Sequence, residues 1–322
     1  MNTRPDQPLR LGTRRSKLAM SQSGHVADAV RELTGRPVEL VEITTYGDVS
    51  REHLAQIGGT GVFVTALRDA LLSGEVDFAV HSLKDLPTAQ PEDLVIAAMP
   101  RREDARDALV ARDGLTFEQL PDGARIGTGS PRRTAQLNHL ARSLGKRIET
   151  VPIRGNVDTR IGFVREGQLD AVVLAAAGLN RIGRGDEATD LLSVDSVLPA
   201  PGQGALAVEC LASATDLIAA LGRLDDLHTR VAVTAERSLL AALEAGCSAP
   251  VGAFADLLGD GRIVNEMRLR GVVGTLDGST LVQLSTTGPV PQSYDEAMAL
   301  GRELADEMLA KGAAGLMGER SL

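Results

Sequence analysis

Two arginines lie at the start of a predicted helix in the segment GTGSPRRTAQL, residues 127–137. Ser130 is a typical N-cap, and Pro131 suits the first helical position, where a backbone N–H is dispensable. Arg132 and Arg133 then fall in the first turn, where the positive end of the helix disfavours a cation unless an anion lies nearby. The pattern therefore predicts an anion site at this helix start.

More arginines follow in the same part of the chain. Arg154 and Arg160 flank a second expected helix start in IRGNVDTR, and Arg181 comes after an apolar segment. Between residues 125 and 181 the chain holds nine Arg and one Lys against two Asp and two Glu, whereas the whole protein carries a formal charge of −9. Guanidinium groups bind carboxylates in a bidentate way. The cluster favours a pocket for a ligand with many carboxylates, and the alternative is a set of solvated helix faces.

A lysine and an aspartate follow another apolar segment, in HSLKDLP at residues 81–87. Lys84 and Asp85 should lie at the carboxyl end of a buried strand, the edge at which open α/β sheets bind ligands. Asp85 would either form a structural salt bridge or stabilise positive charge that develops on a substrate. His81, inside the strand, is predicted to be a packed histidine rather than a base.

The chain contains two cysteines. Cys210 ends the apolar run ALAVEC, which favours a buried and inert thiol. Cys247, in EAGCSAPVG, is expected on an accessible turn between a helix end and a loop with a proline. A thiol in that position is an inert side chain, a nucleophile or an attachment point for a group.

Composition excludes several functions. Aromatic residues make up 2% of the chain, Trp is absent and the net charge is negative, so nucleic-acid binding is not expected. No apolar run approaches the ~20 residues of a membrane span. The N-terminal residues lack the apolar core of a signal peptide, and two cysteines suit a reducing compartment, so we expect a cytoplasmic protein. The five scattered histidines and the cysteines form no metal-binding motif.

Strand and helix patterns alternate in the first part of the chain. Residues 9–13, 38–43 and 76–82 are predicted strands, and residues 62–73 a predicted helix. Such alternation is typical of βαβ units with parallel strands.

The same order of signals occurs twice. LRLGTRRSKLAMSQ at 9–22 resembles ARIGTGSPRRTAQL at 124–137, and GEVDFAVHSLKDL at 74–86 matches GQLDAVVLAAAGL at 167–179. We therefore predict an α/β protein with two similar lobes joined by two crossings. The expected division is residues 1–101 and 202–224 for lobe 1, 105–198 for lobe 2, and 227–322 for a smaller C-terminal α/β domain with an antiparallel sheet.

Taken together, these segments resemble the porphobilinogen deaminase (hydroxymethylbilane synthase) family. The resemblance rests on LRLGTRRSKLA, AVHSLKDLP, REDARDAL, GTGSPRRTAQL, IRGNVDTR, LAAAGLNR, LPAPGQGA and TAERSLLAALEAGCSAPVG, in this order over nearly the whole chain. It implies two lobes like a type II periplasmic binding protein and a monomeric transferase of tetrapyrrole (haem) biosynthesis. Such an enzyme joins four porphobilinogen molecules, with loss of ammonia, to a covalent dipyrromethane primer and releases hydroxymethylbilane by hydrolysis.

The resemblance also implies residue roles. Cys247 would carry the dipyrromethane cofactor through a thioether, and Asp85 would be the catalytic carboxylate. The cofactor carboxylates would be held by Lys84, Thr128, Ser130, Arg132 and Arg133. The incoming substrate would be bound by Arg14, Ser16, Ser82, Arg154, Arg160 and Arg181. No metal is implied.

Some features depart from the family pattern, and other functions are considered. In the glycine-rich loop 48–61, Gln56 and Thr60 stand where many relatives carry lysines, which questions a role of that loop in covering the site with positive charge. A non-catalytic two-lobed protein that binds a polycarboxylate would explain the repeat and the arginines, but not Cys247. An enzyme of phosphate esters would need an acidic metal cluster or a P-loop, and neither motif is present.

Overall fold

The computed structural model describes residues 7–43, 61–244, 249–259 and 264–317. The chain divides into two compact units, Met1–Arg102 with Ala205–Arg230, and Glu103–Gly204 with Val231–Leu322. It therefore leaves the first unit after residue 102, returns at residue 205 and leaves again after residue 230. The finer division into three domains with the boundaries given above stays a prediction. Cys247 and nearly all of the loop 48–61 lie outside the described residues.

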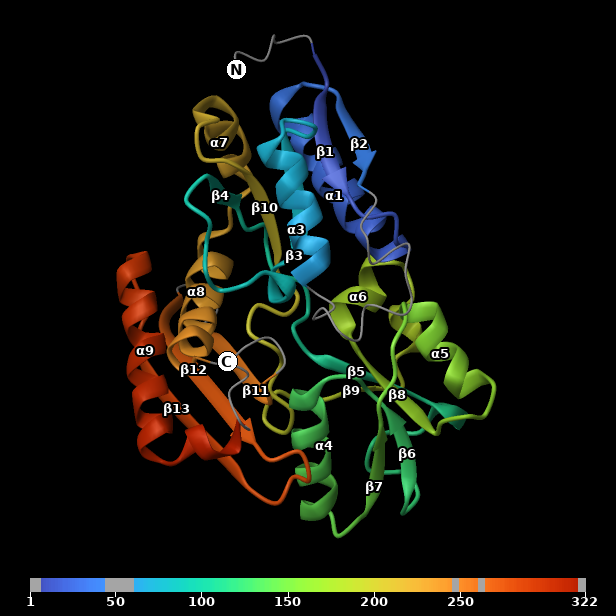
Figure 1. The fold of residues 1–322 in the computed structure, drawn as a ribbon. Helices are drawn as coiled ribbons and strands as arrows, with labels where there is room; N and C mark the ends of the chain where they lie inside the picture. Colours follow the sequence, from blue (N-terminus) through green and yellow to red (C-terminus); the bar gives the residue numbers. More distant parts are fainter. Residues whose placement is uncertain (1–6, 44–60, 245–248, 260–263, 318–322) are drawn as a thin grey trace. The chain divides into compact units, whose positions relative to one another are not determined.

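The first unit is built on a five-stranded mixed sheet in the order β2-β1-β3-β10-β4 (Figure 1). Its strands are β1 (Leu9–Thr13), β2 (Val38–Glu42), β3 (Phe78–Ser82), β4 (Leu94–Ala98) and β10 (Leu206–Leu211). β1 runs parallel to β2 and β3, whereas β10, the first strand after the chain returns, is antiparallel to β3 and β4. The strands predicted at 9–13, 38–43 and 76–82 are thus confirmed, with small shifts at their ends.

Helices cover both faces of this sheet. Helices α1 (Lys17–Thr34) and α7 (Thr215–Leu221) share a core with Leu9 and Leu11, while α3 (Gly61–Leu72) packs on the other face through Leu67 and Leu71. Ser16 caps α1 by accepting a hydrogen bond from the Ala19 N–H, and Gly35 ends it in a left-handed conformation. The helix therefore begins and ends where its sequence signals predict.

The second unit contains a sheet of the same design, in the order β7-β6-β8-β5-β9. Its strands are β5 (Asp107–Ala111), β6 (Ala124–Gly127), β7 (Ile148–Val151), β8 (Ala171–Ala175) and β9 (Asp190–Leu191). β6 runs parallel to β7 and β8, and β5, the first strand after the chain enters this unit, is antiparallel to β8 and β9. Helix α4 (Pro131–Ser143) packs on one face, and α5 (Val157–Arg165) and α6 (Ala176–Arg181) pack on the other.

The repeated aspartates perform the same task in both sheets. Asp77 accepts hydrogen bonds from the backbone N–H of Arg10 at 2.7 Å and from its guanidinium Nη2 at 2.8 Å. In the second sheet, Asp170 accepts from the backbone N–H of Arg125 at 2.7 Å and pairs with Arg112 at 3.0 Å. Each carboxylate thus joins the two central parallel strands at the start of the second one. The short repeat seen in the sequence therefore has a structural cause, and the predicted α/β duplication is confirmed.

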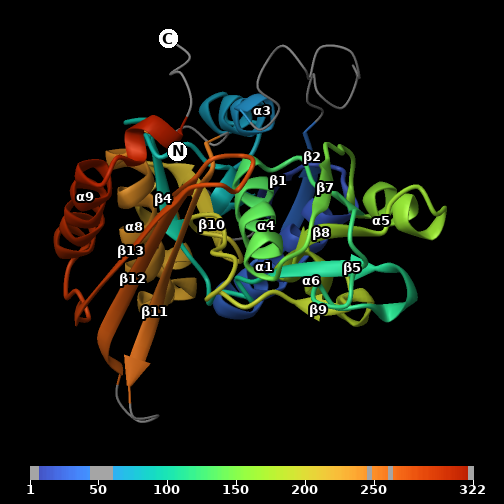
Figure 2. The ribbon, with the colours of Figure 1, turned by 90° about the horizontal axis from the view of Figure 1, so that it is seen from below.

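A three-stranded antiparallel sheet forms the C-terminal part of the second unit (Figure 2). It consists of β11 (Val251–Gly259), β12 (Val264–Gly274) and β13 (Leu281–Pro289). Helices α8 (Leu227–Ala242) and α9 (Tyr294–Ala310) bury one face through a core that includes Leu239 and Met308. The antiparallel C-terminal sheet is therefore confirmed. The remaining helical elements of the described residues are short 3₁₀ turns at Leu83–Asp85, Arg112–Gly114, Gly185–Glu187, Gly222–Leu224 and Ala313–Leu316.

A buried glutamate fastens the C-terminal sheet to the segment that leads back toward the first unit. Glu236 of α8 is fully buried, and its carboxylate accepts hydrogen bonds from the Gly202 N–H at 2.7 Å and the Ala255 N–H at 2.9 Å. The Ala253 N–H donates to the Pro199 carbonyl at 3.0 Å. Residues 199–202 are therefore held by α8 and β11 together.

Among the described helices, none has the length and apolar character needed to cross a bilayer.

The first unit also buries a carboxylate, Glu209 of β10. Arg68 of α3 pairs with it at 2.9 Å, Gln90 donates to it at 3.1 Å, and His81 Nε2 lies 3.0 Å from its Oε2. Burial opposes ionisation, but His81 and Arg68 outweigh it and lower the pKa of Glu209 to about 2. Cys210, the next residue, is also buried, and its burial together with the Glu209 charge raises the pKa of its thiol to about 11. His81 is thus a packed histidine, as predicted.

Glu209 should make the protein sensitive to acid. Because its pKa is lowered by folding from 4.5 to about 2, its contribution to stability is complete above pH 4.5 and is lost as the pH falls through this window. For wild type, this loss amounts to at most roughly 3 kcal/mol in the free energy of unfolding. Glu209→Gln should be less stable at pH 7 and show a flatter pH dependence between these values, measured by urea titration. Glu75→Gln, an exposed neutralisation in the same unit, is the control, and a wild-type slope in Glu209→Gln would contradict the assignment.

Candidate active site

The carboxyl edge of the first sheet gathers five of the predicted site residues. Arg14 and Ser16 follow β1, while Ser82, Lys84 and Asp85 lie at the end of β3, the neighbouring parallel strand. Helix α1 is fastened to both strand ends, because Gln22 donates to the Ser82 hydroxyl at 3.0 Å and Ser23 donates to Thr13 at 2.7 Å. These residues therefore share one sheet edge on a rigid base.

Asp85 ends a 3₁₀ turn whose backbone is well anchored. Leu83 of this turn is fully buried, and its N–H donates to the Ala205 carbonyl at 3.0 Å. The Asp85 side chain is half-buried, and within the described residues its carboxylate forms neither a hydrogen bond nor an ion pair. The structural alternative raised by the sequence, a salt bridge that occupies this carboxylate, is therefore not seen in the described part of the chain.

The carboxyl edge of the second sheet carries the predicted cationic residues. Thr128 and Ser130 follow β6, Arg154 follows β7, and Arg181 ends α6, the helix after β8. Ser130 caps α4 by accepting from the Arg133 N–H, and the buried Thr128 hydroxyl accepts from the Ser130 N–H at 3.2 Å. The turn needs glycine at 129, because a Cβ there would lie 2.7 Å from the Ile153 carbonyl oxygen. This close approach brings the turn after β6 against the segment that carries Arg154.

Arg132 and Arg133 find their anion within the chain. Both are buried in the first turn of α4, and they pair with the two carboxylate oxygens of Asp107, the first residue of β5, at 2.8 Å each. Burial would raise the pKa of Asp107, but the two guanidinium groups outweigh it and hold that pKa far below its usual range. The sequence argument thus identified the need for an anion, and Asp107 was not predicted to supply it.

Of the three other arginines at this edge, Arg160 and Arg181 are half-buried and differ in their partners. Arg160 of α5 donates from Nε to the Gly155 carbonyl at 2.8 Å and has no ion pair within the described residues. Arg181 donates to the Gly204 carbonyl at 2.6 Å. Burial lowers the pKa of both, and the Arg133 charge lowers that of Arg160 further. Arg154 is exposed and lines an open pocket of about 530 Å³ with Arg125 and Phe163.

Comparison with known proteins assigns the chain to a family. Residues 9–219 match the family model "Porphobilinogen deaminase, dipyromethane cofactor binding domain", and residues 230–310 match "Porphobilinogen deaminase, C-terminal domain". The chain belongs to the porphobilinogen deaminase family. It is 80% identical to "Porphobilinogen deaminase 1" of Streptomyces avermitilis over 98% of this chain and 99% of that protein. It is 58% identical to "Porphobilinogen deaminase" of Thermobifida fusca, over 95% of this chain and 94% of that one.

Among solved structures, the chain is similar to the second substrate-binding domain of a putative amino acid ABC transporter from Streptococcus pneumoniae. The identity is 15% and the TM-score 0.41, over 68% of this chain and 91% of that one. The family assignment rests on the sequence matches alone.

Membership of the porphobilinogen deaminase family confirms the function expected from the sequence. The chain is a transferase that joins porphobilinogen units with loss of ammonia, and it contains a domain that binds the dipyrromethane cofactor. The matches support this enzyme and not the non-catalytic polycarboxylate-binding protein considered as an alternative.

The donor set at the second edge fits a group that carries carboxylates. Asp107 neutralises one of the two buried charges of Arg132 and Arg133, and the Nε atoms of both side chains lack a hydrogen-bond partner among the described residues. Among the described residues, Arg160 adds a further charge without an ion pair. Within that part of the chain, the edge therefore keeps an excess of positive charge around Arg132 and Arg133 and two N–H groups without a hydrogen-bond partner, which suits a group that carries carboxylates.

Two buried side chains of this edge, Asp107 and Gln203, were missed from the sequence. Gln203 donates to the Asp107 carboxylate and to the Ala105 carbonyl, at 2.8 Å each. The available signal was an acidic residue directly before the apolar run ALVA, since a carboxylate at the start of a buried strand needs a cation.

We expect Arg160 to contribute to activity and not to the stability of the fold. Burial and the nearby Arg133 charge both disfavour the charged form of Arg160 and so lower its pKa. The charge of Arg160 is therefore unfavourable in the folded chain without a bound anion. Arg160→Gln should leave the melting temperature unchanged or raise it, while kcat/KM for porphobilinogen falls at least about tenfold, roughly 1.4 kcal/mol of transition-state stabilisation. Arg165→Gln, on the same helix but exposed and paired with Glu187, is the matched control. A lower melting temperature with unchanged kinetics would assign Arg160 a structural role instead.

Proposed function

We propose that the two sheet edges perform different tasks in the synthesis of hydroxymethylbilane from four porphobilinogen molecules. The observation that carries this proposal is the chemical contrast between corresponding edges of two sheets with the same topology. The first edge bears the Asp85 carboxylate without an ion pair in the described chain, and the second bears two buried arginines that share one carboxylate.

The second edge is suited to hold acidic side chains. Each porphobilinogen ring carries an acetate and a propionate, so every added unit brings two more carboxylates. Guanidinium groups bind such carboxylates in a planar, bidentate way and remain charged when half-buried. We assign the cofactor carboxylates to Thr128, Ser130, Arg132 and Arg133 of the second edge, together with Lys84 of the first. We assign the incoming substrate to Arg154, Arg160 and Arg181 of the second edge, together with Arg14, Ser16 and Ser82 of the first.

Asp85 is suited to the chemical step. Loss of ammonia from the aminomethyl group leaves positive charge on the substrate-derived pyrrole, and a fixed carboxylate stabilises that charge where it develops. Asp85 can also accept a hydrogen bond from a pyrrole N–H, which orients the ring. The bound dipyrromethane supplies the ring carbon to which the first new unit is joined. The backbone of the turn at Leu83–Asp85 is anchored by the hydrogen bond from the Leu83 N–H to the Ala205 carbonyl, which limits the reorganisation of Asp85 during the reaction.

We assign the covalent attachment of the cofactor to Cys247. The other thiol supports this choice by contrast, because Cys210 is fully buried and its pKa is raised to about 11, which leaves almost no reactive thiolate. We also propose that the enzyme acts as a cytoplasmic monomer without a nucleic-acid partner. The formal charge of −9 supports the absence of such a partner.

The attachment should be visible by mass spectrometry. Purified protein should carry the extra mass of two linked pyrrole units on the peptide that contains Cys247. Cys247→Ala should lack both the mass and the turnover of porphobilinogen, because the chain then has no site for the thioether. Cys210→Ala, the matched control, should keep both. Active wild-type protein without added mass would refute the attachment.

Asp85 should be needed for turnover but not for the fold. Asp85→Asn keeps the size of the side chain and removes its charge, so the variant should keep the cofactor mass and the wild-type melting temperature. Its kcat should fall by at least about 100-fold, roughly 2.7 kcal/mol, the range seen when one stabilising group is removed from a charged transition state. Asp93→Asn, an exposed neutralisation in the same unit, should retain full activity. Normal turnover in Asp85→Asn would show that the charge is stabilised by another group.

A further inference from the structure

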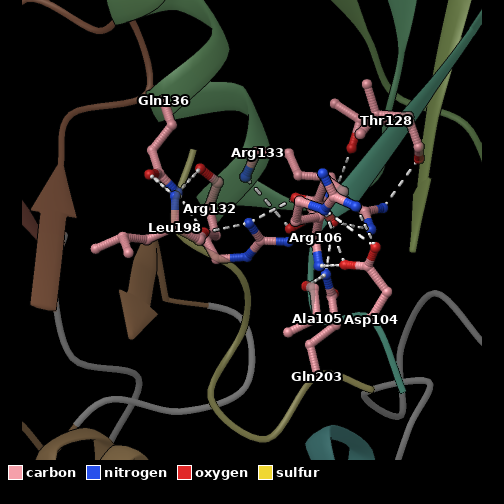
Figure 3. Close-up of polar contacts among 12 residues, drawn as sticks. Asp104, Ala105, Arg106, Thr128, Arg132, Arg133, Gln136, Leu198 and Gln203 are labelled. Atoms are coloured by element: carbon pink, nitrogen blue, oxygen red, sulfur yellow. Dashed lines mark hydrogen bonds and ion pairs between the residues drawn. The ribbon is translucent and has the colours of Figure 1, made fainter. Parts of the chain in front are cut away.

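Asp107 lies at the centre of a buried polar cluster in the second unit. Figure 3 shows its partners Arg132, Arg133 and Gln203. It is fully buried at the start of β5, and its carboxylate receives Arg132 Nη1, Arg133 Nη2 and Gln203 Nε2, each at 2.8 Å. Three donors on two oxygens occupy most of the hydrogen-bonding capacity of this group. Asp107 is therefore surrounded by its partners and has no side-chain surface left for a ligand.

The guanidinium groups are fixed from further directions. Arg132 Nη1 also donates to the Leu198 carbonyl at 2.6 Å, and Arg133 Nη1 donates to the Val173 carbonyl of β8 at 3.0 Å. Gln136, one turn further along α4, holds Leu198 itself by donating to its carbonyl at 2.9 Å and accepting from its N–H at 2.7 Å. The two arginines thus have a single geometry, set by α4, β5, β8 and residue 198.

The charges of the cluster do not balance. Two guanidinium groups face one carboxylate, and both Nε atoms lack a hydrogen-bond partner among the described residues. Without Asp107 two like charges would be buried side by side, which is strongly destabilising. With a second carboxylate in the chain the pair would be neutral and would not attract an anion. One buried carboxylate therefore allows both arginines to stay in place and leaves one positive charge.

We propose that Asp107 is a positioning residue for the cofactor: it orients Arg132 and Arg133 and sets their net charge so that they bind one carboxylate of the primer. This inference rests on the proposed cofactor-binding role of the two arginines. Asp107 acts through them and does not contact the primer. The competing explanation is that Asp107 only stabilises the fold of the second unit through two buried ion pairs.

The two explanations differ in how Asp107 and the primer affect each other. If Asp107 only stabilises the fold, its replacement lowers the melting temperatures of the primer-free and primer-bearing proteins equally. If it positions the arginines for the primer, replacement also reduces the stabilisation that the primer confers. The difference between the two melting temperatures is therefore the quantity to measure, as in a double-mutant cycle.

The experiment uses the full chain in both forms. Primer-free protein is expressed in cells that cannot make porphobilinogen, part of it is loaded by incubation with porphobilinogen, and intact mass verifies each form. Asp107→Asn keeps the shape and removes the charge, and Asp107→Glu keeps the charge and displaces it. In both variants the gain in melting temperature on loading should fall to roughly half of the wild-type gain or less. An unchanged or larger gain overturns the inference.

Two further variants make the test decisive. Asp122→Asn, the exposed partner of Arg147 in the same unit, is the matched control and should leave the gain unchanged. Gln203→Met removes one hydrogen bond to Asp107 but keeps both ion pairs. It replaces the Asp107 variants in the test if those do not fold. Its gain in melting temperature on loading should also be smaller than that of the wild type. A wild-type chain that never acquires primer mass would refute the proposed function. If the wild type acquires the primer and the variants show the same gain in melting temperature on loading, this inference is refuted while the proposed function stands.

Discussion

A fully buried guanidinium group needs an anion beside it, and this constraint governs the pair of buried arginines at the edge of the second sheet. Asp107 supplies that anion for Arg132 and Arg133, which would otherwise place two cations at the positive end of α4. Because one carboxylate serves two arginines, the site stays cationic. Arg160, beside Arg133 and without an ion pair in the described chain, increases this excess. An enzyme for acidic pyrroles needs such an imbalance, and the surrounding packing keeps it in place.

The two sheets show how one architecture accommodates opposite chemistry. Their strand orders are equivalent, and Asp77 and Asp170 join the central strands in the same way. The residues that follow the strands differ, since β3 leads to a carboxylate and β6 to two arginines. Both sets occupy the carboxyl edge, because parallel strands end there and the connecting segments are free to vary. The same topology therefore presents a carboxylate beside Lys84 at one edge and a pair of buried arginines at the other.

Much of this arrangement could be predicted from local signals. The strand at Leu9–Thr13, the caps at Ser16, Ser130 and Gly35, and the repeat all depend on neighbouring residues, and the structure has them where the sequence places them. The partner of Arg132 could not be predicted in this way, because Asp107 lies 25 residues earlier on a strand that was not predicted. The Glu209 cluster was missed for the same reason: Arg68 and Gln90 reach β10 from more than 100 positions away in the chain. Local patterns indicated that an anion was needed, and only the fold shows which residue meets that need.

The Glu236 carboxylate also constrains the order in which the protein can be completed during synthesis. Gly202 donates to it, so the buried Gly202 N–H has no such acceptor until α8 has emerged from the ribosome. Gln203, the next residue, is the one that reaches Asp107. The segment that carries Gln203 to the arginine cluster therefore acquires this acceptor only after α8 has been translated, because Glu236 lies 34 residues beyond Gly202.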